Sequence, residues 1–325
     1  MPNQAVRSPG RSYRDGITLI ALMDMFPNEE TATRWFEATM WPTGRCCGHC
    51  GSVETSEVPN AKPMPYWCKT CRSYFSVRTG TALERSRVPL RKWAIAIYLE
   101  ITSLKSVSSM KLHRDLGVSQ PTAWFMLHRI REGWKRPDNP YSGPVEVDET
   151  YVGGSQRNMS ARRRKQLPDG GASHMTAVVG MRDRDTNHVS AEVVADTTAA
   201  TLQGFVGERV DGNATVYTDE SRSYEGLPFD HETVRHSVAE YVRGQAHTNG
   251  IESFWAVLKR AHKGVFHKIS PKHLQRYVTE FAGKHNVRDL DTMAQMTALV
   301  AGLVGKRLMR RDLIADNGLS SGARS

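Results

Sequence analysis

The first part of the chain repeats apolar residues at the spacing of amphipathic helices. The stretch "ITLIALMDMFPNEETATRWFEATMWP" predicts two short helices that are separated at Pro27, with Asn28 able to cap the second. Further on, Pro89 opens "LRKWAIAIYLEITSLK", which predicts an apolar helix of roughly four turns. We therefore expect this part of the chain to be mainly helical.

A pair of helices joined by a tight turn is predicted next. Leu112 and Leu116 mark the apolar face of the first helix, Gly117 provides the turn, and Ser119 caps a second helix. In a DNA-binding helix-turn-helix this second helix, from Gln120 to Arg131, enters the major groove, whereas an ordinary helical hairpin is the alternative. The candidate DNA-contacting side chains on it, expected to be exposed, are Gln120, Thr122 and Arg129.

The pattern changes to strands after Pro144. The segment "EVDETYVGG" alternates valines with acids, which puts Glu146 and Asp148 on the face opposite the valines. Two more strands follow around a turn at 184–187, and then come a helix, the strand "ATVYTDES", the strand-like "HETVRHS" and the helix "TNGIESFWAVLKRAHKG". This order predicts a mixed α/β domain.

Length and charge narrow the class of partner. The 325 residues suffice for two or three domains, and 44 lysines plus arginines against 34 acids give a net charge of +10, which favours a nucleic acid. No apolar run approaches the roughly 20 residues of a membrane span, and the start of the chain lacks a signal-peptide core. We expect a soluble cytoplasmic protein with a disordered basic tail over residues 1–15.

All five cysteines lie between Cys46 and Cys71. Cys47 and Cys50 form one CxxC pair, Cys68 and Cys71 form another, and 17 residues separate the two pairs. This spacing predicts one structural Zn²⁺ held by four thiolates, with Cys46 left over. A pair of disulfides in a secreted protein is the alternative, which the odd number of cysteines disfavours.

Three acids mark the strand-rich part of the chain. Asp148 and Asp219 each lie on a strand, and Glu252 follows at the start of a helix. If these carboxylates converge, they suit two Mg²⁺ or Mn²⁺ ions, hard cations that take oxygen ligands and stabilise the attacking and leaving oxygens of a phosphodiester. An exposed edge strand is the alternative for the acid-rich segment.

Three segments resemble a known family. "VEVDETYVGG", "VYTDESRSY" and "HTNGIESFWAVLKRAHKGVFHKIS" are similar to the signature blocks of the DDE transposases of bacterial insertion sequences, in the zinc-ribbon branch related to Merlin elements (ISXO type). The resemblance runs from about Phe26 to Asn286. It implies a ribonuclease H-like catalytic domain, a mixed five-stranded sheet with helices, preceded by a zinc ribbon and a helix-turn-helix. Asp148 would lie on the first strand, Asp219 on the fourth, and Glu252 on the helix after the fifth.

The resemblance also implies an activity. A transposase of this kind binds the terminal inverted repeats of its element and catalyses metal-dependent DNA strand cleavage and strand transfer, as a homodimer or larger synaptic assembly on double-stranded DNA. Because some family members are assigned an asparagine as the third ligand, Asn249 is the alternative to Glu252. A zinc-ribbon DNA-binding regulator with an inactive catalytic fold and a structure-selective nuclease are the rival functions.

Other side chains are candidates for supporting roles. Glu146 shares the face of Asp148, whereas Glu149 points the other way and is expected to cap or to pair with a basic residue. Lys259 lies on the helical face of Glu252 and can reach a phosphate, and the histidines His247 and His262 are weaker candidates. Basic residues at the edges of the cysteine module and in a polar loop are further candidate DNA contacts, with solvated charges as the alternative: Arg72, Arg78, Arg85, Arg87, Arg162, Arg163, Arg164 and Lys165.

The expected domain order follows from these segments. Residues 16–88 hold the N-terminal helices and the zinc ribbon, 89–136 the helix-turn-helix, 144–290 the catalytic domain and 291–325 a helical C-terminal tail.

Overall fold

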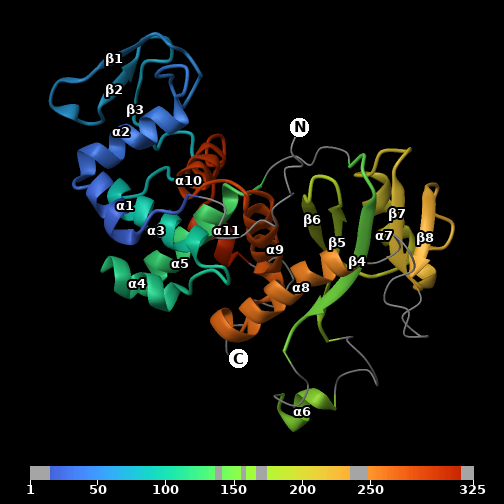
Figure 1. Ribbon diagram of the computed structural model, residues 1–325. Helices are drawn as coiled ribbons and strands as arrows, with labels where there is room; N and C mark the ends of the chain where they lie inside the picture. Colours follow the sequence, from blue (N-terminus) through green and yellow to red (C-terminus); the bar gives the residue numbers. More distant parts are fainter. Residues whose placement is uncertain (1–14, 136–140, 155–158, 166–173, 235–247, 316–325) are drawn as a thin grey trace. The chain divides into compact units, whose positions relative to one another are not determined.

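The computed structural model describes residues 15–135, 141–154, 159–165, 174–234 and 248–315 (Figure 1). They form two compact units. The first combines residues up to 135 with Val287–Ala315, and the second comprises the described residues from 141 to Asn286. The second unit is therefore inserted between two parts of the first.

The first unit is mainly helical, as its apolar spacing predicts. Its helices are α1 (Leu19–Met25), α2 (Glu29–Met40), α3 (Leu90–Thr102), α4 (Ser109–Leu116), α5 (Gln120–Glu132), α10 (Thr292–Ala301) and α11 (Arg310–Ile314). The Asn28 side chain accepts a hydrogen bond from the backbone N–H of Thr31 at 2.9 Å, so it caps α2 as the sequence indicates. The helices enclose one hydrophobic core around the fully buried Phe36 and Trp93.

The predicted pair of helices α4 and α5 is present, with the expected cap at Ser119 and a further cap at Ser108. Ser108 Oγ accepts the backbone N–H of Lys111 at 3.2 Å, and Ser119 Oγ accepts that of Thr122 at 3.3 Å. Gly117 ends α4 with φ +58°, a left-handed conformation that glycine adopts without steric cost. The local residue types therefore determine where both helices begin and where the first ends.

A small antiparallel sheet holds the cysteine segment. Its strands run in the order β1 (Thr55–Glu57), β2 (Tyr66–Cys68) and β3 (Ser73–Phe75), with the short helix η2 (Pro59–Ala61) between the first two. Trp41, Tyr66 and Phe75 pack on the buried thiols, and this cluster makes the ribbon's own core. So few apolar residues cannot stabilise a sheet of this size alone, which fits a metal-dependent fold.

The segment predicted as a helical C-terminal tail over 291–325 is helical in its described part and packs into the first unit. Helix α10 packs on α2 and α3, and Met296, Leu299 and Leu303 are fully buried in the same core as Trp93. The apolar face of α10 is buried against helices of the first unit, so the segment after the second unit belongs to the first unit. Residues 316–325 lie outside the described residues.

The second unit is built on a five-stranded mixed sheet in the order β6-β5-β4-β7-β8 (Figure 1). Strands β4, β5 and β6 are antiparallel neighbours, whereas β4, β7 and β8 are parallel. This is the ribonuclease H-like topology, and the predicted fold class is confirmed. The strands span Val145–Val152 (β4), Thr176–Asp183 (β5), Val189–Val194 (β6), Thr215–Asp219 (β7) and Asp230–Val234 (β8).

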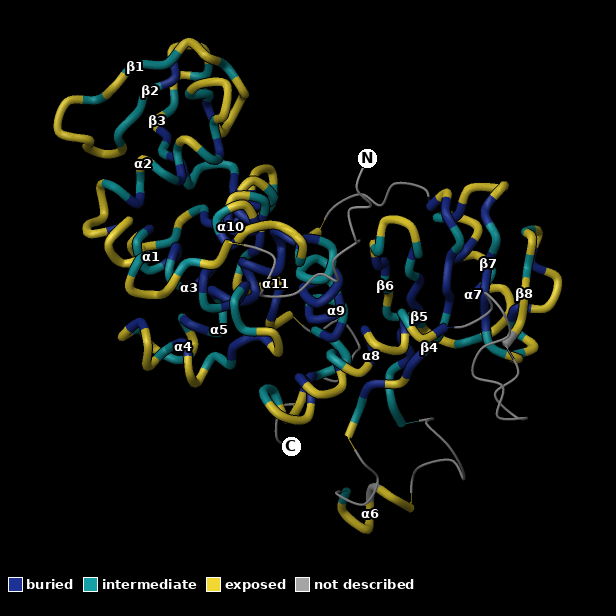
Figure 2. Tube along the Cα trace, viewed as in Figure 1, coloured by how far each residue is buried: buried dark blue, intermediate teal, exposed yellow. Residues whose placement is uncertain are grey.

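Helices cover both faces of this sheet. Helix α7 (Ala199–Gly207) packs on the face that carries Val145 and Val147, and α8 (Asn249–Ala261) with α9 (Pro271–Asn286) packs on the face that carries Val152 and Val178. Figure 2 shows the buried stretches of β4 and β5 at the centre of the unit. The short elements α6 (Ala161–Arg164), η4 (Arg222–Tyr224) and η6 (His262–Phe266) complete the unit.

Within the described parts of the chain, we find no helix whose length and hydropathy would allow it to cross a membrane.

Candidate functional site

Three carboxylates gather on the α8 face of the sheet, at the end of its parallel strands. In β4 and β7, Glu146 is paired with Tyr217, so Asp148 and Asp219 lie two residues further along on both strands and on the same face. Helix α8 packs across β4 and β5 and carries Glu252 in its first turn. The fold thus brings together acids from three segments that are far apart in the sequence.

The pKa of Asp148 shows that these acids interact electrostatically. The pKa of Asp148 is raised to about 7 because the carboxyl is buried and because Glu149, Asp219 and Glu252 repel its charge. A site with this excess of negative charge and only oxygen donors fits hard divalent cations such as Mg²⁺.

A tryptophan fixes the orientation of Asp148. Trp255, which is 3% exposed, donates its indole Nε1–H to Asp148 Oδ2 at 3.0 Å. The indole lies over Gly180, the residue paired with Asp148 across β5. A Cβ at Gly180 would come within 2.6 Å of the Trp255 ring, so only glycine leaves room for the indole at this position.

Glu146 secures the start of the helix that carries Glu252. Its carboxylate is fully buried and accepts the backbone N–H of Ile251 at 2.9 Å, at the N-terminal end of α8. The same carboxylate pairs with Arg182 at 3.3 Å and with Arg184 at 3.0 Å. Gly250 passes so close that a Cβ there would collide with Arg182 and with Glu146. The network ties β4, β5 and α8 together beside the acids.

Among the described residues, Glu149 does not have the predicted basic or capping partner. Its side chain points to the opposite face, as expected from alternation, but there Glu149 Oε2 accepts the hydroxyl of Tyr224 at 2.7 Å. Burial raises the pKa of Glu149, and the nearby Asp219 adds repulsion. A neutral donor suits this half-buried carboxyl because it satisfies an oxygen without a second buried charge.

The two candidates for the third ligand occupy the first turn of α8. Glu252 is exposed, and its Oε1 accepts the hydroxyl of Thr248 at 3.0 Å. Asn249 is also exposed, but it is the first residue of the helix, and the N-cap is Thr248. Asn249 is therefore not in the N-cap position of α8.

The remaining candidates of the second unit have different environments. Lys259 is exposed on α8, whereas His262 is 8% exposed, and burial lowers its pKa, as for a packed side chain. His247 lies outside the described residues, as does the side chain of Arg163. The other residues of the basic loop, all exposed, are Arg162, Arg164 and Lys165.

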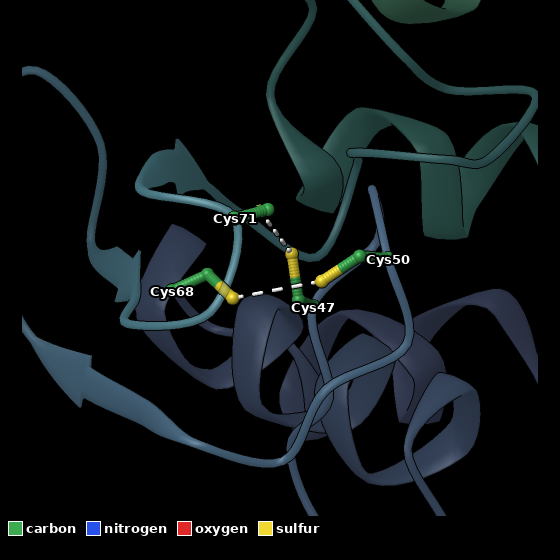
Figure 3. Close-up of side chains that lie close together, drawn as sticks. All are labelled: Cys47, Cys50, Cys68 and Cys71. Atoms are coloured by element: carbon green, nitrogen blue, oxygen red, sulfur yellow. Dashed lines mark hydrogen bonds between the residues drawn. The ribbon is translucent and has the colours of Figure 1, made fainter.

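The four cysteines of the ribbon converge on one point (Figure 3). The Sγ atoms of Cys47, Cys50, Cys68 and Cys71 all lie within 4.8 Å of one another, with Cys47 to Cys71 and Cys50 to Cys68 both at 3.7 Å. A tetrahedral site with Zn–S bonds of about 2.3 Å requires sulfurs about 3.8 Å apart. The thiols fit zinc, and the distances are too long for disulfides.

One of the four thiols, that of Cys68, has an environment that favours its ionised form. The backbone N–H of Cys71 lowers the pKa of Cys68 to about 6. Burial raises the pKa of Cys47 and that of Cys71, because a thiolate that is removed from water loses its hydration. Cys46 lies outside the cluster, as predicted.

The candidate DNA-contacting residues of α5 differ in accessibility. Gln120 is half-buried and donates to Ser109 Oγ at 2.9 Å, and the Thr122 hydroxyl lies 2.8 Å from that of Ser119. Arg129 is not exposed as expected: it is 8% exposed, because its guanidinium turns inward to bind backbone carbonyls. Direct base reading by Arg129 is therefore incompatible with its position.

Sequence reasoning did not find several residues that shape the site. The arginines Arg182 and Arg184 lie in the predicted strand and turn, and the glycine Gly180 has no local signal, since its role depends on the register of β4 against β5. Trp255 is one of the buried apolar residues of α8, and its N–H contact with Asp148 could not be predicted without that register.

Comparisons with known proteins agree on one family. Residues 140–286 match the model of the ISXO2-like transposase domain. An uncharacterised protein in the transposable element ISH50 of Halobacterium salinarum is 29% identical over 255 residues, 74% of this chain and 86% of that protein. An uncharacterised transposase-like protein of Haemophilus influenzae is 34% identical over 97 residues, 29% of this chain and 77% of that protein.

Among solved structures, a chain from the simian T-cell lymphotropic virus intasome in complex with the PP2A regulatory subunit B56 gamma aligns with 14% identity. The alignment covers 58% of this chain and 65% of that chain, with a TM-score of 0.29.

Proposed function

This chain belongs to the ISXO2-like transposases of insertion sequences, and we propose on that premise that its second unit cuts DNA at the ends of the element and joins them to a target. The observation that carries the proposal is the single face on which Asp148, Asp219 and Glu252 meet, with the charge of Asp148 disfavoured by its neighbours.

The reaction consists of two phosphoryl transfers. Water first attacks a phosphodiester at the element end, and the bond to the 3′ oxygen breaks to leave a free 3′-hydroxyl. That hydroxyl then attacks a target phosphodiester, so that one phosphodiester replaces another without an external energy source. Divalent cations held by the three carboxylates would activate each nucleophile and stabilise each leaving oxyanion.

The chain's own residues position these groups. The indole of Trp255 orients one oxygen of Asp148, which leaves the other oxygen of that carboxylate for a metal. Glu146 holds the N-terminus of α8 and with it Glu252, our preferred third ligand over Asn249 because a carboxylate offsets metal charge. Lys259, two turns further along α8, is a cation for a DNA phosphate.

The first unit would bind the DNA. It carries the cysteine ribbon and the helix pair α4 and α5, and Gln120 and Thr122 are the candidate contacts at the start of α5. Two element ends must be cut and joined together, so a homodimer or larger synaptic assembly is part of the proposal. A single Zn²⁺ per chain would stabilise the ribbon and take no part in the transfers.

The proposal is tested with Asp148→Asn and Asp219→Asn variants on a labelled duplex that carries the element end. We expect both variants to keep DNA binding and to lose cleavage and strand transfer in Mg²⁺ by at least about 100-fold, because each removes a charged ligand. Asp230→Asn is the matched control, since Asp230 is an exposed acid at the opposite end of the same sheet. Near wild-type cleavage in either site variant would reject the site, and cleavage without joining in the wild type would favour a nuclease.

A further inference from the structure

The segment that follows α10 lies against the turn that follows the zinc ribbon. The backbone N–H of Ala82 donates to Leu303 O at 3.0 Å, and that of Gly305 donates to Gly80 O at 2.9 Å. Leu308 is 4% exposed in the same contact region. Residues more than 200 positions apart in the sequence are thus joined into one local structure of the first unit.

Arg129 fastens this structure to α5. Its NH2 donates to Glu84 O at 3.0 Å and to Leu308 O at 3.5 Å, and its guanidinium stacks over the Phe125 ring at 4.3 Å. The side chain is 8% exposed, and its Nε is buried without a hydrogen-bond partner among the described residues. An arginine stays ionised at this degree of burial, so its charge acts on the surface above it.

Two hollows meet above Arg129. One of about 400 Å³ lies between α5 and the segment from Arg85 to Trp93. The other, of about 220 Å³, lies between α5 and the segment from Arg307 to Arg310. Arg129 and Phe125 line both hollows, which makes them neighbouring parts of one basin.

The basin is strongly positive. Glu84 is the one carboxylate among the described residues that line it, and it lies 3.7 Å from Arg85. The cations that line it, which define the basin from here on, are Arg85, Arg87, Lys92, Arg129, Arg307 and Arg310. Cations that face one another without matching acids repel, and an anionic partner relieves that repulsion.

We infer that this basin binds the phosphate backbone of duplex DNA next to the bases contacted by α5, so that the C-terminal arginines take part in DNA binding. The inference rests on the proposed function. Thr122, at the start of α5, lines the first hollow, which makes the basin continuous with the predicted recognition helix. Guanidinium groups bind phosphate oxygens in pairs, and such contacts are independent of base sequence.

Arg307 and Arg310 are suited to a test because both are exposed and neither makes a hydrogen bond or ion pair within the described residues. Their replacement should leave the fold unchanged, which the melting temperature checks. Arg34 is the matched control: it is an exposed arginine of the same unit, with its side chain 73% accessible, and it pairs with Glu30 on α2.

The experiment compares Arg307→Gln, Arg310→Gln and Arg34→Gln in the full chain. Dissociation constants are measured at several salt concentrations on an element-end duplex and on a duplex of unrelated sequence. Each lost phosphate contact should reduce the slope of log K against log salt by about 0.9. We expect this reduction and a several-fold weaker affinity for both duplexes in the two basin variants, no change of slope in Arg34→Gln, and a retained slope in Arg307→Lys.

Several outcomes would overturn the inference. Unchanged slopes in the basin variants, with normal wild-type binding, would reject the basin and leave the proposed function intact. An equal loss in Arg34→Gln would attribute the effect to net charge, and a defect confined to the element-end duplex would indicate base reading. Lost self-association with unchanged DNA affinity would identify a protein partner. A wild-type chain that binds neither duplex would overturn the proposed function as well.

Discussion

The thiols of the ribbon and the carboxylates of the second unit are both acidic groups that a cation can hold, but the chain builds them in opposite ways. The four thiols come from one short segment, and their sulfurs lie within 4.8 Å of one another. The carboxylates come from two strands and a helix, and burial together with repulsion from neighbouring acids raises the pKa of Asp148 to about 7. The first set has the spacing to surround one metal ion, whereas the second is assembled from distant segments.

The difference between the two sets of ligands predicts a different role for a metal ion bound at each. A closed set of four soft ligands leaves no position for a substrate, so its metal can only stabilise the fold. An open set of hard ligands on a prefolded sheet does not need its metal for folding, and the free coordination positions can be taken by DNA and water. The two sites should therefore respond differently to the same perturbations.

The largest effect is expected from the ribbon. Cys68→Ser should remove the zinc and unfold the ribbon, because metal binding contributes about 10–16 kcal/mol to the folding of small zinc domains. Elemental analysis and limited proteolysis measure the two losses. A strong chelator should have the same effect on the wild type, while the sheet of the second unit keeps its circular dichroism. Stoichiometric zinc in a folded Cys68→Ser variant would contradict the four-thiolate site.

The next largest effect is expected on the free energy of unfolding of the second unit, measured in the absence of metal. Glu146→Gln should lower its free energy of unfolding by roughly 2–3 kcal/mol, because it leaves Arg182 and Arg184 without their buried counter-charge. Urea unfolding measures the loss. The control is Glu192→Gln, an ion pair with Arg209 in which the glutamate side chain is 48% accessible, and it should cost less than about 1 kcal/mol. Equal losses of unfolding free energy in the two variants would mean that the buried ion pairs of Glu146 stabilise the unit no more than an exposed ion pair does.

A smaller effect on stability, but a clear one on metal binding, is expected for Trp255→Phe. The ring keeps its packing, whereas Asp148 loses the N–H that orients it, so affinity for Mn²⁺ should fall about tenfold. Calorimetric titration measures the affinity directly, without turnover. Trp134→Phe removes a similar N–H contact with Glu100 in the first unit and should leave Mn²⁺ affinity unchanged. Wild-type affinity in Trp255→Phe would show that the contact is only structural.

The smallest effect on stability separates the two candidates for the third ligand. Asn249→Ala should leave the melting temperature within about 1 °C of wild type, since Thr248 and not Asn249 is the N-cap of α8. Glu252→Gln, also folded, should abolish strand transfer in Mg²⁺ because it removes a charged ligand. If instead Glu252→Gln is active and a folded Asn249→Ala is inactive, the third ligand is Asn249.

The features that the sequence predicts well are those that depend on neighbouring residues. The caps at Asn28 and Ser119, the turn at Gly117 and the cysteine spacing all act within a few positions, and the structure has them as expected. The strand that ends at Asp219 is likewise present. Family resemblance supplied the rest of the fold class, since no local pattern states the order of strands in a sheet.

The features that the sequence does not reveal depend on tertiary packing. Arg129 has the spacing of an exposed helical residue, but the two carbonyls it binds come from segments far from it in the sequence. Glycine is required at position 180 because β5 pairs with β4 there and the Trp255 ring lies against it. A polar residue on a helix or a glycine in a strand has several local interpretations, and packing selects one of them.

The insertion of the second unit into the first sets an order of completion during synthesis. A ribosome that has reached Asn286 has produced every strand and helix of the ribonuclease H-like sheet. The core around Trp93 still lacks Leu299 and Leu303, and the turn after the ribbon still lacks its backbone partners. Because domains fold as they emerge, the second unit can form before the core of the first unit is complete. A chain that is truncated near its end would thus retain the carboxylate face on an intact sheet, whereas the core of the first unit would be incomplete.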